Sequence, residues 1–212
     1  MSAAHVADHH ALVSLYADES CLGNGRAGAT PGGAGALLEF EREGGEVVRR
    51  DLWVAEPDTT NNRMALRSVI DSFRALHAKG ACFRIVFTSD SRYLIDGMND
   101  WVHGWARRGW VRKGGAIENL AFWHDAIAAV NGSAVEWRWV RGHDGHTQNE
   151  YVNFLATRAA REQTRSAGWI DSGFDLWLEE ECNARLLTTG PAAFPRTFSA
   201  ARALPAVPAA RQ

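Results

Sequence analysis

The stretch CFRIVFTSD, residues 82–90, decides the fold class. Its middle is rich in apolar and β-branched residues, as a buried strand is, and it ends in Asp90. The earlier stretch LVSLYAD, residues 12–18, has the same form and ends in Asp18. Acidic side chains at the carboxyl ends of neighbouring strands are typical of α/β active sites. We therefore expect an α/β protein with a polar site where these two strands end.

The segments around these two strands predict the remaining elements. Residues 35–55 form two extended stretches around Gly44 and Gly45, which predict a hairpin. Residues 66–77 have helical spacing, and Gly80 follows as a helix end. Another helix, a basic tryptophan-rich loop, a helix over about residues 116–130, a strand at 134–142 and a helix with a capping box at Thr147 and Glu150 complete the order. This order predicts a five-stranded mixed sheet, three strands antiparallel and two parallel, flanked by helices.

Length and composition predict one folded domain with an extension. The chain has 212 residues and three widely spaced cysteines, so no disulfide framework is expected. Because its net charge is −2, no general attraction to nucleic acid is expected either. No apolar run reaches the roughly 20 residues of a membrane helix, and we expect a cytoplasmic protein. The expected divisions are a tail at 1–10, a domain at 11–166 and an extension at 167–212, of which about the last 25 residues are expected to be disordered.

Five motifs occur in the order found in bacterial ribonucleases H of type 1. They are DESCLGN, TTNNRM, TSDSRYL, WVHGWARRGWVRKG and WVRGHDGHTQNE. The helix after the last motif agrees as well, and the resemblance covers about residues 12–165. The resemblance implies a ribonuclease H-like fold and a protein that binds RNA-DNA hybrids. In this family, four carboxylates hold two magnesium ions about 4 Å apart, which promote hydrolysis of the RNA strand.

The predicted metal site departs from the family pattern. Asp18 and Asp90 match the first and third family acids, whereas Ala65 stands at the second and Asn153 at the fourth. An amide oxygen can still bind Mg²⁺ or Mn²⁺, but a methyl group cannot. Glu19 replaces a glycine usual in the family and could compensate, although strand alternation predicts that it points away from Asp18. The favoured expectation is an exposed charge at Glu19, and at most one well-held metal ion.

The resemblance also implies residues for proton transfer and for hybrid binding. His143 matches a mobile family histidine that helps proton transfer or product release. Trp101 and Trp105, four residues apart, could equally pack in the core. The residues expected to contact the hybrid, through 2′-hydroxyls, the minor groove or the DNA strand, are Asn24, Thr60, Asn61, Asn62, Ser91, Trp101, Trp105, Arg107, Arg108 and Lys113.

Three functions remain open from the sequence. The leading hypothesis is a monomeric protein that binds RNA-DNA hybrids and cleaves them weakly or not at all, because two of the four acids are replaced. The alternative is an active metal-dependent ribonuclease that uses Asp18, Asp90, Asn153 and Glu19. A second alternative is a non-catalytic module that binds a protein partner through the extension.

Overall fold

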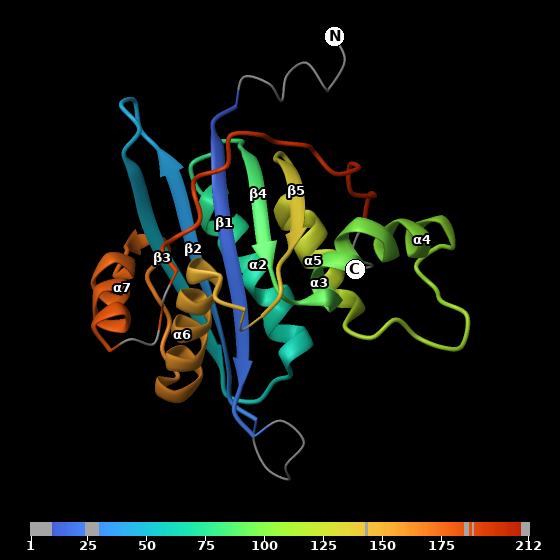
Figure 1. Ribbon diagram of the computed structural model, residues 1–212. Coiled ribbons are helices and arrows are strands. Elements are labelled where there is room, and N and C mark those ends of the chain that lie inside the picture. The colour runs from blue at the N-terminus through green and yellow to red at the C-terminus, as the bar shows by residue number, and fades with distance from the viewer. Residues whose placement is uncertain (1–9, 24–29, 143, 185–186, 188, 209–212) are drawn as a thin grey trace.

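The computed structural model describes residues 10–23, 30–142, 144–184, 187 and 189–208. Its centre is a mixed sheet with the strand order β5-β4-β1-β2-β3-β6 (Figure 1). β1, β2 and β3 are antiparallel, and β4 and β5 run parallel to β1. The predicted five strands are confirmed, and β6 is an addition from the extension that the sequence did not predict. The strands are β1 (Leu12–Cys21), β2 (Gly32–Glu41), β3 (Val47–Glu56), β4 (Arg84–Ser89), β5 (Ala134–Trp139) and β6 (Ile170–Asp171).

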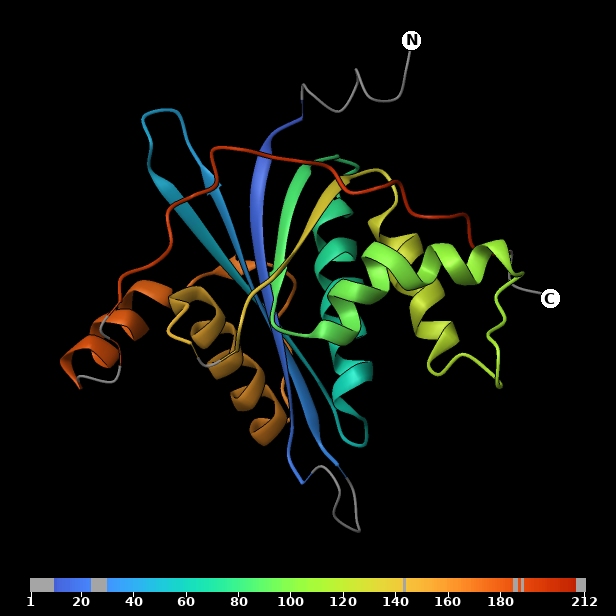
Figure 2. The same cartoon turned by 45° about the vertical axis from the view of Figure 1, so that its right-hand side comes forward.

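Helices cover both faces of the sheet. α2 and α5 lie on one face, and α6 lies on the other, with α7 beside it (Figure 2). The larger core lies beneath α2 and α5 and includes Phe73, Phe87 and Trp123; the smaller lies beneath α6 and α7. The helical elements are α2 (Asn61–His77), α3 (Arg92–Asp96), the π-helical turn η1 (Gly97–Trp101), α4 (Val102–Arg107), α5 (Leu120–Val130), α6 (Thr147–Glu162) and α7 (Phe174–Asn183).

Two helix starts differ from the predicted ones. α5 begins at Leu120 rather than near Ala116, because Asn119 has a left-handed backbone conformation with φ of 56°. The N-cap of α6 is His146 rather than Thr147, and its Nδ1 accepts a hydrogen bond of 3.4 Å from the backbone N–H of Asn149. The capping-box prediction at Thr147 is therefore wrong, and the Thr147 hydroxyl instead donates to the C-terminal extension.

Two glycines of β2 allow α6 to lie very close to the sheet. A Cβ atom on Gly35 would overlap the backbone of Val152 and Ala156, and one on Gly33 would overlap Ala156 and Ala160. Gly35 is also the register partner of Asp18 in β1. The second and third turns of α6 therefore pack at the level of Asp18.

The extension is tied to the domain by a buried carboxylate. Asp51 of β3 is 3% exposed and accepts hydrogen bonds from the Tyr151 hydroxyl (2.5 Å), the Ser172 hydroxyl (2.6 Å) and the Gly173 N–H (2.9 Å). Burial raises the pKa of Asp51, while these hydrogen bonds act in the opposite direction. Because Tyr151 belongs to α6 and Ser172 to the extension, Asp51 joins three parts of the structure.

Residues 189–208 follow the surface in an extended course (Figure 1). Phe194 is buried, Arg196 forms two hydrogen bonds with Glu41, and the Ala201 N–H donates to the Val135 carbonyl at 2.8 Å. The disorder expected for the last residues stays a prediction about behaviour in solution. Among the described residues, no helix is long and apolar enough to cross a membrane.

Candidate active site

Asp18, Glu19 and Asp90 gather at the carboxyl ends of β1 and β4. The ladder between β1 and β4 reaches only Tyr16 and Thr88, whereas β1 continues to Cys21. Asp18 and Glu19 are therefore paired with β2 on one side and have no strand partner on the other. Asp90, which directly follows β4, stands at this open side. The predicted meeting of Asp18 and Asp90 is thus reproduced by the topology.

The carboxyl groups of Asp18, Glu19 and Asp90 lie near enough to interact electrostatically. Burial raises the pKa of Asp18, and the charges of Glu19 and Asp90 raise it further. A hydrogen bond with Asp90 also favours the protonated form of Asp18. The Glu19 N–H, which donates to Oδ1 of Asp18 at 2.7 Å, acts in the opposite direction. In the absence of a cation, this cluster therefore binds protons more strongly than isolated carboxylates do.

Glu19 is not the exposed charge that the sequence favoured. Its Oε2 atom is buried and has no hydrogen-bond partner, and the Ser91 side chain hydrogen-bonds to its carboxylate. Burial, followed by the charge of Asp90, raises the pKa of Glu19 to about 8. Alternation along β1 places Glu19 on the opposite face from Asp18, as predicted. Because β4 does not pair with β1 beyond Tyr16, the Glu19 carboxylate nevertheless interacts with Asp90 and Ser91.

Glu19 lies on the sheet face that α2 covers. Its neighbours on the same face of β1, Ala17 and Cys21, pack in or against the core cluster that contains Ala65. Ala65 is fully buried in the second turn of α2. Glu19 therefore brings a carboxyl group to the face of the sheet on which α2 carries the apolar Ala65.

Asn153 approaches from the opposite side of the sheet. It belongs to the second turn of α6, the helix that packs over Gly35 at the level of Asp18. Its Oδ1 accepts a hydrogen bond of 3.4 Å from the Thr157 hydroxyl one turn further on. The amide is half-buried and supplies an oxygen atom of the kind that Mg²⁺ binds.

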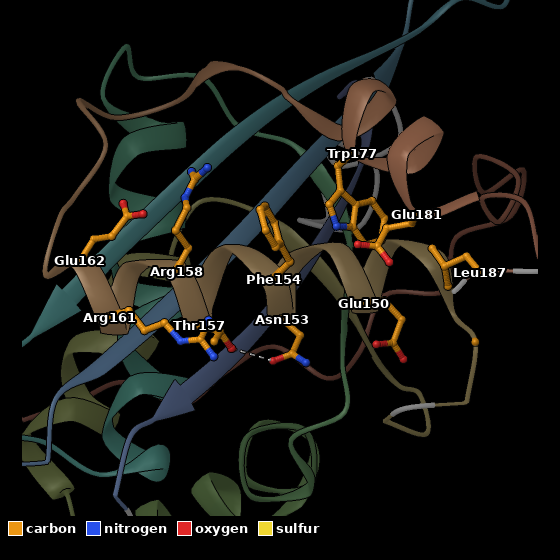
Figure 3. A pocket seen from close by; sticks show the side chains of 11 residues that line it. Glu150, Asn153, Phe154, Thr157, Arg158, Arg161, Glu162, Trp177, Glu181 and Leu187 are labelled. Carbon is orange, nitrogen blue, oxygen red and sulfur yellow. Dashed lines mark hydrogen bonds between the residues drawn. The ribbon is translucent and has the colours of Figure 1, made fainter. Parts of the chain in front are cut away.

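A groove of about 720 Å³ runs from Asn153 along α6 (Figure 3). Asn153, Thr157 and Arg161 extend from one side of the helix, and Phe154 and Arg158 extend from the other, where Trp177 of α7 forms the wall. The Arg158 guanidinium lies 4.8 Å from the Trp53 ring and 5.5 Å from the Phe154 ring. The groove therefore combines an amide, aromatic surface and arginine with the side chains of Glu150, Glu162 and Glu181.

The sequence did not single out three neighbours of Asp90. The backbone of Gly142 lies so close that a methyl group there would overlap Oδ2 of Asp90. The Trp139 indole N–H donates to the Asp90 carbonyl at 3.0 Å, and the Arg92 guanidinium lies 3.6 Å from the Trp139 ring. Trp139, a partly exposed tryptophan within the predicted strand and the last residue of β5, was the available signal for this contact.

The predicted hybrid-binding residues of α2 lie at its entrance. Thr60 is the N-cap of α2 and accepts a hydrogen bond from the Arg63 N–H at 3.3 Å. Asn61 and Asn62 are half-buried in the first turn, and Oδ1 of Asn61 is buried without a hydrogen-bond partner. Ser91 begins α3 but makes no capping hydrogen bond, because its hydroxyl faces Glu19 instead.

The basic tryptophan-rich segment forms a protrusion around α4. Trp101 is 39% exposed, and its ring lies 6.1 Å from that of Trp105. Trp105 packs inward against Trp123 at 5.5 Å, so the core-packing alternative holds for Trp105 and not for Trp101. The three predicted cations are exposed: Arg107, Arg108 and Lys113. Asn24 and His143, the two remaining predicted residues, lie outside the described part of the chain.

The donor atoms suit a hard cation, although the side chains are not yet arranged around one. Within the described residues, no three His, Cys, Asp or Glu side chains form a group that could hold a metal ion as they stand. The buried Oε2 of Glu19 nevertheless lacks a partner, and the charges of Glu19 and Asp90 raise the pKa of Asp18. A divalent cation would satisfy this oxygen and relieve the repulsion, so the residues fit magnesium or manganese.

Comparison with known proteins agrees with this geometry. Residues 10–161 match the family model of RNase H. Ribonuclease H of Stutzerimonas stutzeri is 40% identical over 154 residues, which cover 72% of this chain and 94% of that protein. Ribonuclease H of Erythrobacter litoralis is 40% identical over 153 residues, covering 72% of this chain and 98% of that protein.

One similar crystal structure also includes the extension. LC9-RNase H1, described as a type 1 RNase H with the type 2 active-site motif, is 59% identical, with a TM-score of 0.89. The match covers 96% of this chain and 98% of that one. The solution structure of the PFV RNase H domain, 14% identical with a TM-score of 0.58, shares the fold alone. On its sequence and its fold, the chain belongs to the ribonuclease H family.

Proposed function

We propose that this protein is a metal-dependent endoribonuclease that hydrolyses the RNA strand of RNA-DNA hybrids, with Glu19 as its second acid. The observation that carries the proposal is the buried Glu19 carboxylate beside Asp90, on the sheet face where Ala65 leaves no acid. The proposal therefore favours the alternative left open by the sequence over a protein that only binds hybrids. The similar protein whose description combines a type 1 enzyme with a type 2 active-site motif supports this choice.

Each residue of the site has a defined task in this proposal. Asp18, Glu19, Asp90 and the Asn153 amide oxygen hold Mg²⁺ or Mn²⁺. When bound, the metal activates a water molecule and stabilises the leaving 3′ oxygen. Ser91 keeps the Glu19 carboxylate in place through its hydrogen bond. Cation binding displaces the protons that the crowded carboxyl groups hold near neutral pH.

The substrate is positioned by the surfaces on either side of the metal site. Thr60, Asn61 and Asn62 at the entrance of α2 are proposed to contact the hybrid in its minor groove, where 2′-hydroxyls distinguish RNA from DNA. The exposed cations around α4 and the ring of Trp101 are proposed to hold the DNA strand. Because the net charge is only −2 overall, this local patch has to provide the phosphate contacts, and binding should weaken as salt rises.

The test is cleavage of a labelled RNA-DNA hybrid by the purified chain in Mg²⁺ or Mn²⁺, compared with the Asp18→Asn variant. The proposal expects cleavage that EDTA and Asp18→Asn both abolish. A protein that binds hybrids without cleaving them is the second candidate, and Ala65 and Asn153, which stand where the family resemblance implies acids, favour it. Tight hybrid binding at low salt with no cleavage in either metal would establish that candidate instead.

A further inference from the structure

The first turn of α6 is polar and yet buried, which is unusual for the start of a helix. Thr147, Gln148 and Asn149 are 1%, 0% and 3% exposed. Helix starts usually face water, because their first N–H groups have no partners within the helix. Here the C-terminal extension lies over this turn, and residues 189–192 provide the partners for the Thr147 and Gln148 side chains.

The contacts between this segment and α6 are specific hydrogen bonds. The Thr147 hydroxyl lies 3.0 Å from the carbonyl oxygens of both Thr189 and Gly190. The Gln148 amide pairs with the backbone of Ala192 in both directions: its Nε2 donates to the carbonyl at 2.9 Å, and its Oε1 accepts from the N–H at 3.0 Å. A fully buried glutamine satisfied in this way favours one position of the segment over any other.

The same segment also holds the loop before α6. The Thr189 hydroxyl donates to the Gly145 carbonyl at 2.7 Å. At its other end, this loop places Gly142 against the Asp90 carboxylate. Asn153 follows in the second turn of the helix whose first turn is held. The extension therefore contacts both structures that reach the carboxylate cluster from this side.

We propose that Thr189, Gly190 and Ala192 are positioning residues for the active site, acting through the loop before α6 and through the first turn of α6. This inference rests on the proposed function for its effect on catalysis, but not for its effect on the loop. Its consequence is that part of the support for the active site comes from outside residues 10–161, the region that matches the family model. The extension would then be required for full activity without contacting the substrate.

The test uses point variants, because deletion of the whole extension would also remove the buried Phe194 and β6. Thr189→Ala removes the hydroxyl that holds Gly145. Thr189→Ser keeps it. Thr197→Ala is the matched control, since Thr197 lies in the same segment and its side chain makes no hydrogen bond to the described residues.

Two readouts separate a positioning role from a general loss of stability. In Thr189→Ala, hydrogen exchange of the backbone amides of residues 144–150 should become about fivefold faster, the effect of losing one hydrogen bond. The kcat for hybrid cleavage should fall about tenfold with KM within about twofold of the parent, as for other residues that orient metal ligands. Thr189→Ser should restore both values, and Thr197→Ala should change neither.

The outcomes also distinguish this inference from the proposed function. Unchanged exchange and unchanged kcat in Thr189→Ala, equal to those of Thr197→Ala, would overturn the positioning role. An equal rise of KM and fall of kcat that Thr189→Ser does not restore would overturn it as well. If the parent protein cleaves no hybrid, the proposed function fails, while faster exchange confined to residues 144–150 would still support the anchoring of the loop.

Discussion

Replacement of Glu19 by glutamine should change activity and stability in opposite directions. Glutamine keeps the shape of the side chain and its contact with Ser91 but removes the charge that a divalent cation needs. Disturbing residues around a metal site typically costs about 10 to 100-fold, so loss of a carboxylate ligand should lower kcat at least roughly 100-fold. Without metal, the same change removes a buried carboxyl group whose ionisation destabilises the folded protein.

The size of the stability effect follows from the pKa of Glu19. Burial and the charge of Asp90 raise this pKa from 4.5 to about 8, so the folded metal-free protein keeps a proton that the unfolded chain releases. The group's contribution is complete below pH 4.5 and is lost as the pH rises through 8. At pH 7 the free energy of unfolding is lowered by at most roughly 3 kcal/mol. For a chain of this size, each kcal/mol corresponds to about 2 to 4 °C in Tm.

Thermal unfolding from pH 5 to 8, with and without Mg²⁺, measures both effects together with hybrid cleavage. Relative to Glu19→Gln, the metal-free parent should lose stability as the pH rises, and saturating Mg²⁺ should reverse the order by stabilising only the parent. The matched control is Glu43→Gln, an exposed glutamate in the β2-β3 turn. Cleavage by Glu19→Gln at the rate of the parent would refute the assignment of Glu19 as a metal ligand.

The other predictions concern the remaining parts of the site. Ala65→Glu should destabilise the protein, because Ala65 is fully buried and Glu19 already occupies this side; in the Glu19→Gly background it should instead recover cleavage. Asn153→Asp should raise Mg²⁺ affinity measured by calorimetry, since it adds a negative ligand; unchanged affinity would place Asn153 outside the metal site. Gly142→Ala should lower kcat about 10-fold or more by displacing Asp90, with a melting temperature close to that of the parent. Arg108→Gln should weaken hybrid binding and reduce the salt slope of log Kd by about 1, and an unchanged slope would exclude a phosphate contact.

Most of the fold could be predicted from the sequence because its signals are local. The apolar strands, the helical spacing of residues 66–77 and the glycine turn at Gly44 and Gly45 each reflect the preferences of a few neighbouring residues. The start of α5 was misplaced for a local reason, the left-handed backbone of Asn119, whereas the other errors arose where distant segments decide. The start of α6 is buried by residues more than 40 positions later, which engage Thr147, so the cap falls on His146. β6 has only two residues and depends on pairing with β3.

The sequence could indicate only part of how the acidic side chains are arranged. Asp18 and Asp90 could be paired from the sequence, since both follow apolar strands. Glu19 could not, because alternation alone places its side chain on the far face of β1. Only the sheet register, in which β1 continues beyond the end of β4, shows that the edge is open and that the carboxylate can reach Asp90.

The close packing of α6 on β2 has a consequence for how mutational data on this protein should be interpreted. Gly33 and Gly35 contribute no chemical group, yet any side chain on them would push away the helix that carries Asn153. The direct contact between the backbones of β2 and α6 therefore determines how close Asn153 can lie to Asp18. A screen that scores cleavage alone would give substitutions at both glycines the same effect as substitutions of the proposed metal ligands. A parallel screen for folded protein would separate variants in which α6 is displaced from variants that lose only a ligand.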